Sequence, residues 1–156
     1  NLEFVEQPLP PGCAEDARRI CRDSGVRLAL DEEAAGIELA RYILKAEMCD
    51  VLVIKPMLIG GLTECLHLCD LAMRHGMTVV YTTAWESDIG VAATLHLAAA
   101  LGRNRTAAGL STAGMIADGL VDHPLTIRSG RLAVHDRPGL GLTLSARVSA
   151  SQRGQA

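Results

Sequence analysis

Short apolar runs alternate with longer stretches of helical periodicity along most of this 156-residue chain, and this alternation constrains the fold more than any other feature. The apolar runs are residues 2–6, 26–30, 51–54 and 77–83, with a weaker fifth run at 108–111. The helical stretches are 14–24, 36–47, 62–75 and 91–101. Strands that alternate with helices lie parallel and are joined by right-handed crossovers. The sequence therefore predicts an α/β fold.

The spacing of apolar residues also predicts which side of each helix faces the sheet. Residues three or four positions apart share one helix face. The side chains placed on the buried faces of the first three helices are Ala14, Ala17, Ile20 and Cys21, then Leu39, Ala40, Ile43 and Leu44, then Leu62, Leu66, Cys69 and Met73.

Charged residues recur where the apolar runs end. Glu6, Asp31 and Lys55 end the first three runs at nearly equal spacing, and Glu86 follows the fourth. Charged residues at the same end of successive parallel strands point into one shared opening, as in a (β/α)-barrel active site. A nucleotide-binding sheet would need a glycine-rich first turn, and the glycines here fit neither GxGxxG nor the P-loop. Because a complete barrel takes about 200 residues or more, we expect part of a barrel.

The residues at these ends suggest a metal site with a lysine opposite. Glu6 and Asp31, which Glu32 follows, are hard oxygen ligands suited to Mg²⁺, although helix caps or solvated loop acids have the same appearance. Lys55 ends a fully apolar run and precedes Pro56, so it either reaches solvent or lies near anions. Near a metal it could act as an acid, a base or a stabilising cation.

A second polar cluster follows the fourth run. It consists of Thr82, Thr83, Glu86 and Ser87, with Asp88 next in the chain. The two acids could belong to a binding site, or they could complement the first turn of the next helix. Both interpretations remain open at this point.

Composition excludes several classes of function. The net charge is −3 with no basic block, which argues against nucleic acid as a partner. The apolar stretches fall well short of the roughly 20 residues of a membrane span, and no secretory signal is visible. Five cysteines without a CxxC pair predict a reduced, cytoplasmic protein.

Four segments together resemble a known family. Residues 4–8 (FVEQP), 28–32 (LALDE), 54–62 (IKPMLIGGL) and 85–90 (WESDIG) are similar, in order and spacing, to barrel strands of the enolase superfamily, in its muconate-lactonizing subgroup. That family has a modified (β/α) barrel with an N-terminal capping domain. A bound Mg²⁺ holds a substrate carboxylate while a lysine removes the neighbouring α-proton, which gives an enediolate.

The resemblance implies a role for each strand end. Glu6 and Asp31 would be metal ligands on the fourth and fifth barrel strands, Lys55 the lysine on the sixth, and Glu86 would mark the seventh. The family's third metal ligand, its KxK motif and its capping domain have no counterpart here. We therefore expect the C-terminal part of a barrel, about strands 4 to 8, from a longer enzyme or a truncated relative.

The resemblance and the pattern of residues together divide the chain into three parts. Residues 1–122 would form the partial barrel, 123–144 would return toward the capping-domain side with small antiparallel strands, and 145–156 would be a disordered tail. A half-barrel exposes unpaired edges, so we expect a homo-oligomer or a requirement for the N-terminal half.

Within the subgroup the chain looks most like o-succinylbenzoate synthases, which act in menaquinone biosynthesis. The similarity lies in residues 109–112, 117–120, 124–125 and 130–132. Dipeptide epimerases usually carry an Asp-x-Asp pair on the eighth strand, where this chain has Ser111 and Thr112. The expected substrate is thus a small carboxylate contacted by Thr82, Thr83, Glu86, Ser87, Ser111 and Thr112. An N-acylamino-acid racemase, a dipeptide epimerase and a non-catalytic half-barrel remain alternatives.

Overall fold

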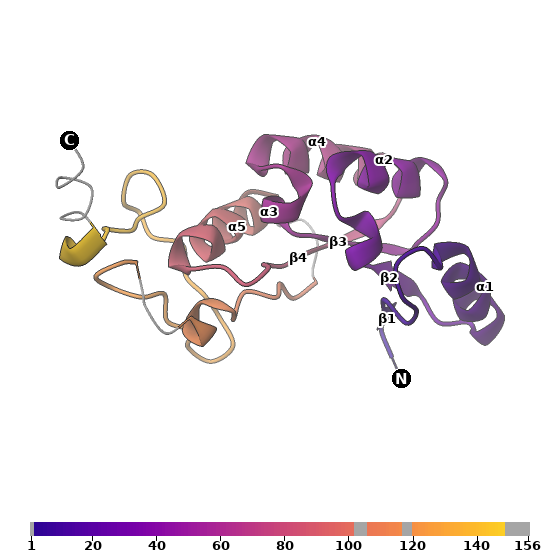
Figure 1. Ribbon diagram of the computed structural model, residues 1–156, viewed down its shortest axis with the longest axis horizontal. Helices are drawn as coiled ribbons and strands as arrows, with labels where there is room; N and C mark the ends of the chain where they lie inside the picture. Colours follow the sequence, from indigo (N-terminus) through magenta and orange to yellow (C-terminus); the bar gives the residue numbers. More distant parts are fainter. Residues whose placement is uncertain (1, 102–105, 117–119, 149–156) are drawn as a thin grey trace.

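The computed structural model describes residues 2–101, 106–116 and 120–148, and its core is one parallel sheet with helices between the strands (Figure 1). The strands, in sheet order, are β1 (Val5–Glu6), β2 (Leu28–Leu30), β3 (Val51–Ile54) and β4 (Thr78–Tyr81). The longer helices are α1 (Ala14–Ser24), α2 (Ile37–Lys45), α4 (Leu62–Arg74) and α5 (Asp88–Leu101). The short ones are η1 (Glu32–Ala34), α3 (Pro56–Ile59) and η2 (Ala113–Met115). This order confirms the predicted α/β class.

The helices cover one face of the sheet, as Figure 1 shows for α2 and α4 above the strands. Side chains of the strands alternate between the two faces, because successive residues of a strand point in opposite directions. Leu28 and Leu30 join the large core under the helices, whereas Ala29 belongs to a smaller cluster with Val51 and Val53 on the other face. Burial on both faces explains why β3 is apolar throughout.

The register of the strands brings their carboxyl ends to one edge. Glu6 lies opposite Ala29 of β2, and Ile54 lies opposite Tyr81 of β4. Asp31 and Lys55 are the first residues after β2 and β3. The topology therefore places the three predicted charged ends along the same side of the sheet.

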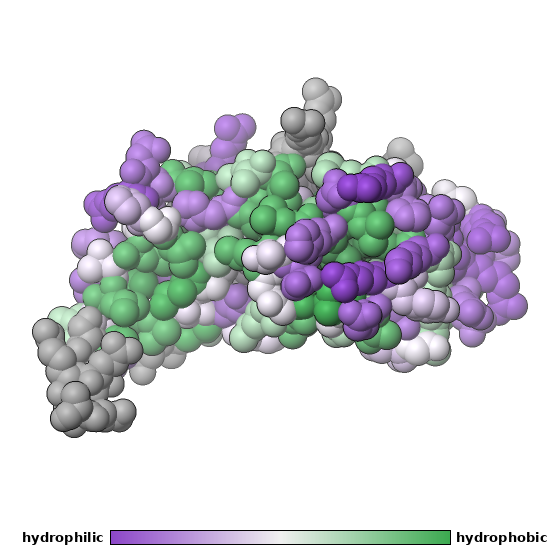
Figure 2. All heavy atoms as spheres, turned by 90° about the horizontal axis from the view of Figure 1, so that it is seen from above, coloured by the Kyte–Doolittle hydropathy of each residue, from purple (hydrophilic) through white to green (hydrophobic). Residues whose placement is uncertain are grey.

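The predicted helix faces were partly wrong. Seven of the predicted side chains are buried as expected: Ala14, Ala17, Cys21, Ala40, Ile43, Leu44 and Cys69. Five larger ones are exposed: Ile20, Leu39, Leu62, Leu66 and Met73. In α4 the side chains against the core are instead Cys65, Leu68, Cys69 and Ala72. Three of these four residues are small, whereas Leu62, Leu66 and Met73 lie on the outer side of the helix. Figure 2, which looks onto the helical side, shows apolar atoms at the surface among charged side chains.

The predicted fifth strand at 108–111 is a single bridge. Gly109 pairs with Thr82 in parallel, accepting the Thr83 N–H at 3.2 Å and donating its own N–H to Tyr81 at 2.9 Å. A Cβ at Gly109 would lie 2.6 Å from Thr82 Oγ1, so only glycine allows this approach. A glycine offers no side chain to pack, and the pairing does not extend into a strand.

The C-terminal segment holds isolated antiparallel bridges rather than the small strands that were predicted. Within the described residues they join Val121 to Leu144 and Arg128 to Arg131. Ser145 donates its N–H to the Leu120 carbonyl at 2.9 Å, so the start of the predicted tail contacts the rest of the chain. Residues 149–156 of that tail, and 117–119, lie outside the described residues.

Two further observations bear on function. All five cysteines are free. In the part of the chain that the structure describes, no helix has the length and apolar character needed to cross a membrane.

Candidate active site at the carboxyl ends of the strands

Lys55 and Asp31 form an ion pair where β2 and β3 end. Pro56 opens α3 and keeps Lys55 in an extended conformation, with φ −113° and ψ 104°. The Lys55 Nζ contacts Asp31 Oδ2, and the two side chains are 16% and 7% exposed. The sequence left open whether Lys55 reaches solvent or an anion, and in the structure its ammonium group contacts the Asp31 carboxylate.

Glu6 stands beside this pair at the end of β1. Partial desolvation raises the pKa of its carboxyl group, the charges of Asp31 and Glu32 raise it further, and Lys55 acts in the opposite direction. Glu6 therefore lies within the electrostatic field of the other three side chains. We call Glu6, Asp31, Glu32 and Lys55 the strand-end cluster.

The strand-end cluster fits part of a magnesium site. Among the described residues no three His, Cys, Asp or Glu side chains form a group that could hold a metal. Glu6 and Asp31 nevertheless supply two carboxylates, and Mg²⁺ is often bound by one or two carboxylates with water and substrate completing its shell. The donor chemistry therefore fits Mg²⁺ as two ligands of a larger set.

Gln7 is a site residue that the sequence analysis missed. Its side-chain oxygen accepts the N–H of Asp31 at 3.1 Å and of Glu33 at 3.3 Å, and its Nε2 donates to the Leu9 carbonyl at 2.9 Å. Gln7 also has a positive φ of 38°. The available signal was an amide side chain directly after a candidate metal ligand.

The threonines predicted to contact substrate are engaged in holding the chain together. Thr83 is buried, and its Oγ1 lies 2.7 Å from Thr112 Oγ1. Thr82 donates its hydroxyl to the Gly109 carbonyl at 2.9 Å. These contacts fix residues 109–112 beside β4, whereas Ser111 is exposed.

Glu86 and Asp88 are buried and bind backbone amides. Glu86 Oε1 accepts the Ala84 N–H at 2.9 Å, and Asp88 Oδ1 accepts the Leu125 N–H at 2.6 Å. Asp88 opens α5, as a first-turn acid does, and its bond ties the C-terminal segment to that helix. Glu86 shapes the loop after β4, together with the half-buried Ser87.

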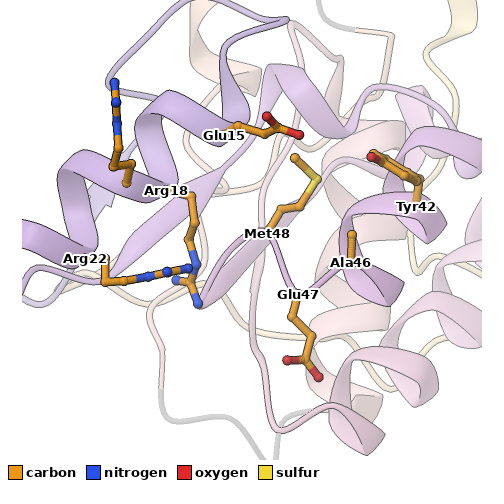
Figure 3. A pocket seen from close by; sticks show the side chains of 8 residues that line it. Glu15, Arg18, Arg22, Tyr42, Ala46, Glu47 and Met48 are labelled. Carbon is orange, nitrogen blue, oxygen red and sulfur yellow. The ribbon is translucent and has the colours of Figure 1, made fainter.

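A groove of about 390 Å³ lies apart from the strand-end cluster, between α1 and α2 (Figure 3). Its wall includes Arg18, whose guanidinium group lies 2.7 Å from Asp50 directly before β3. Burial alone would raise the pKa of Asp50, but the Leu28 N–H at 2.9 Å and Arg18 lower it below its ordinary value. This network ties the amino ends of β2 and β3 together, at the opposite end of the strands from the cluster.

Comparison with known proteins places this geometry in context. The sequence profile of the family described as enolase C-terminal domain-like matches residues 1–148. An o-succinylbenzoate synthase from Thermobifida fusca is 35% identical over 134 residues, which cover 86% of this chain and 41% of that protein. An L-Lys-D/L-Arg epimerase from Methylococcus capsulatus is 33% identical over 144 residues, which cover 91% of this chain and 40% of that protein.

Solved structures agree in fold. A muconate lactonizing enzyme from Pseudomonas putida superposes with a TM-score of 0.87 at 23% identity, over 96% of this chain and 42% of that one. The chain thus spans about 40% of the length of the curated relatives it matches.

Proposed function

The chain belongs to the enolase C-terminal domain-like family, and on that basis we propose that it carries part of a Mg²⁺-dependent active site that removes a proton α to a carboxylate. The observation that carries the proposal is the strand-end cluster, in which Lys55 contacts Asp31 beside Glu6 at the ends of three adjacent strands. Active sites of (β/α) barrels gather at these ends of the strands.

In this proposal each member of the cluster has a distinct task. Glu6 and Asp31 hold the metal, and Lys55 presents a cation to the reacting carboxylate. A bound Mg²⁺ would supply the positive charge that makes a weakly acidic α-proton removable. The contact with Asp31 shows that the Lys55 ammonium group lies beside the proposed metal ligands, close to where negative charge would develop on a metal-bound carboxylate.

We further propose that the whole protein catalyses the dehydration that forms o-succinylbenzoate in menaquinone biosynthesis. Support comes from the similarity to the Thermobifida fusca synthase and to a Bacillus subtilis synthase that is 30% identical over 146 residues. In that reaction Lys55 acts as the stabilising cation. We expect the exposed Ser111 and the neighbouring Thr112 to contact the substrate. The buried Thr83 and Glu86 shape the loops around it.

Epimerisation is the second candidate, because the Methylococcus capsulatus epimerase is about equally similar. A cationic amine in such a substrate would need a counter-charge, and residues 111–113 of this chain are Ser, Thr and Ala. Lys55 would then be one of two bases on opposite faces of the substrate, as it would in an N-acylamino-acid racemase.

The natural-length gene product, assayed with Mg²⁺, tests the proposal. We expect formation of o-succinylbenzoate from its cyclohexadiene precursor, and loss of turnover in Lys55→Ala. Incorporation of deuterium from D₂O at the α-carbon of dipeptides or N-acylamino acids, without dehydration, would favour epimerisation or racemisation instead. Full activity in Lys55→Ala would remove Lys55 from the mechanism. Absence of every one of these activities would favour a non-catalytic domain that assembles with a partner.

We also propose a cytoplasmic location, and either self-association or pairing with an N-terminal half. Sedimentation of the purified chain would distinguish a monomer from an oligomer.

A further inference from the structure

We infer that Gln7 is a positioning residue that caps the turn after β2 in place of Asp31, which leaves the Asp31 carboxylate free for cations. The inference rests on the proposed function for the identity of the metal, but not for the role of Gln7. Its evidence is the hydrogen bonding of the loop that follows Asp31.

Asp31 occupies the N-cap position of η1 without acting as a side-chain cap. An aspartate at this position ordinarily turns its carboxylate to the free N–H groups of the first helical turn. Here the Asp31 side chain makes no such bond, and its Oδ2 contacts Lys55.

Gln7 supplies the missing acceptor. Its Oε1 receives the N–H of Glu33, the group an N-cap carboxylate would take, and also the N–H of Asp31 itself. A second donor of the turn, the Ala34 N–H, binds the Asp31 main-chain carbonyl at 2.8 Å. The N–H groups of Glu33 and Ala34 are the ones an N-cap side chain ordinarily takes, and because other groups satisfy both, they do not draw the Asp31 carboxylate away from Lys55.

The backbone at Gln7 is strained to reach this arrangement. A φ of 38° lies in the left-handed region, which is unfavourable for residues other than glycine. Two anchors hold it there, namely the Gln7 N–H on the Ala29 carbonyl at 2.9 Å and Gln7 Nε2 on the Leu9 carbonyl. Strained backbone conformations cluster at functional sites, so the strain at Gln7 supports a positioning role for its side chain.

The first test measures coupling between Lys55 and Asp31 in the 156-residue chain. A double-mutant cycle of Lys55→Met and Asp31→Asn, followed by urea unfolding, gives their interaction energy. We expect a clear coupling in the wild-type background and almost none in the Gln7→Met background, because Asp31 then turns to cap η1. An unchanged coupling in Gln7→Met would overturn the inference.

The second test measures Mg²⁺ affinity by calorimetry. We expect Gln7→Met to weaken binding about 10- to 100-fold, the usual effect of removing a partner that orients a ligand. Equal affinity in wild type and Gln7→Met would count against a positioning role. If the wild-type chain binds no Mg²⁺, the metal chemistry of the proposed function fails for this chain, while the coupling experiment still decides the role of Gln7.

A matched control separates capping from strain. Gln7→Gly removes the cap but relieves the left-handed backbone, and Glu47→Gly relieves the same kind of strain, at a φ of 51°, away from the cluster. We expect reduced Mg²⁺ affinity in Gln7→Gly and wild-type affinity in Glu47→Gly. Wild-type affinity in Gln7→Gly would show that the Gln7 side chain is not needed as a cap and would overturn the inference.

Discussion

Replacing Lys55 with methionine should destabilise the chain, because it leaves the Asp31 carboxylate buried and unpaired. Asp31 is 7% exposed and already lies in the field of Glu6, whose charge has the same sign. Breaking a buried ion pair from one side costs about 3–5 kcal/mol. Because the Lys55 side chain is 16% exposed and the pair lies at the edge of the sheet, we expect the lower end, about 3 kcal/mol. For a chain of this size that corresponds to a Tm lower by about 6–12 °C.

Magnesium should reverse most of that loss. A ligand present at 100 times its Kd stabilises the folded state by about 2.7 kcal/mol, and in Lys55→Met the metal no longer competes with an ammonium group for Asp31. Thermal melts followed by circular dichroism, with and without Mg²⁺, measure both effects. Lys45→Met is the control, since it makes the same change at an exposed position at the end of α2 and should alter stability by no more than about 0.5 kcal/mol. If Lys55→Met melted like Lys45→Met, the ion pair would not have the energetic role derived from its burial.

Three further predictions concern other parts of the fold. Asp50→Asn should lower the free energy of unfolding at pH 7 by about 1–3 kcal/mol, as measured by urea unfolding. Because folding lowers the pKa of Asp50, its contribution to stability is present above the unfolded-state pKa and is lost as the pH falls through the folded-state pKa. The difference from wild type should therefore shrink as the pH is lowered below 3.8. Gly90→Ala would place a Cβ 2.0 Å from Glu86 Oε2, so it should lower the Tm, and adding Glu86→Ala should recover part of the loss. Burial raises the pKa of Cys65 to about 12, so a thiol reagent at pH 8 should label the half-buried Cys13 well before Cys65, as mass spectrometry of a time course would show; equal rates would contradict the packing of α4.

The sequence predicted the parts of this fold that depend on local pattern. The run Val51–Ile54 was found in full because a strand buried on both faces is apolar throughout. Leu66 was placed in the core and is exposed, because periodicity identifies an apolar stripe without showing which stripe the sheet selects. The strand at 108–111 was wrong because its pairing stops at Gly109, where close contact with Thr82 leaves no room for a side chain.

The candidate site was predictable in its members but not in their contacts. A charged residue that ends an apolar run is visible in the sequence, and Glu6, Asp31 and Lys55 were identified in this way. That Lys55 binds Asp31 could not be read from spacing, because it depends on the register between β2 and β3. The hydrogen bonds of Gln7 depend on a left-handed backbone at that residue, which no local pattern announces.

The strand ends share one arrangement that explains why their reactive side chains are available. At each end the backbone must turn, and a turn leaves N–H groups that a nearby acid would normally accept. After β2 that need is met by Gln7, which caps η1, so Asp31 is left to face Lys55. After β3, Pro56 has no N–H to satisfy and keeps the preceding backbone extended, and Lys55, whose ammonium group can only donate, faces Asp31. The residues flanking the charged positions therefore do the structural work of the turns. Substituting Gln7 or Pro56 should disturb the strand-end cluster more than substituting Glu32, which is exposed and makes no hydrogen bond to Lys55 or Asp31 in the described structure.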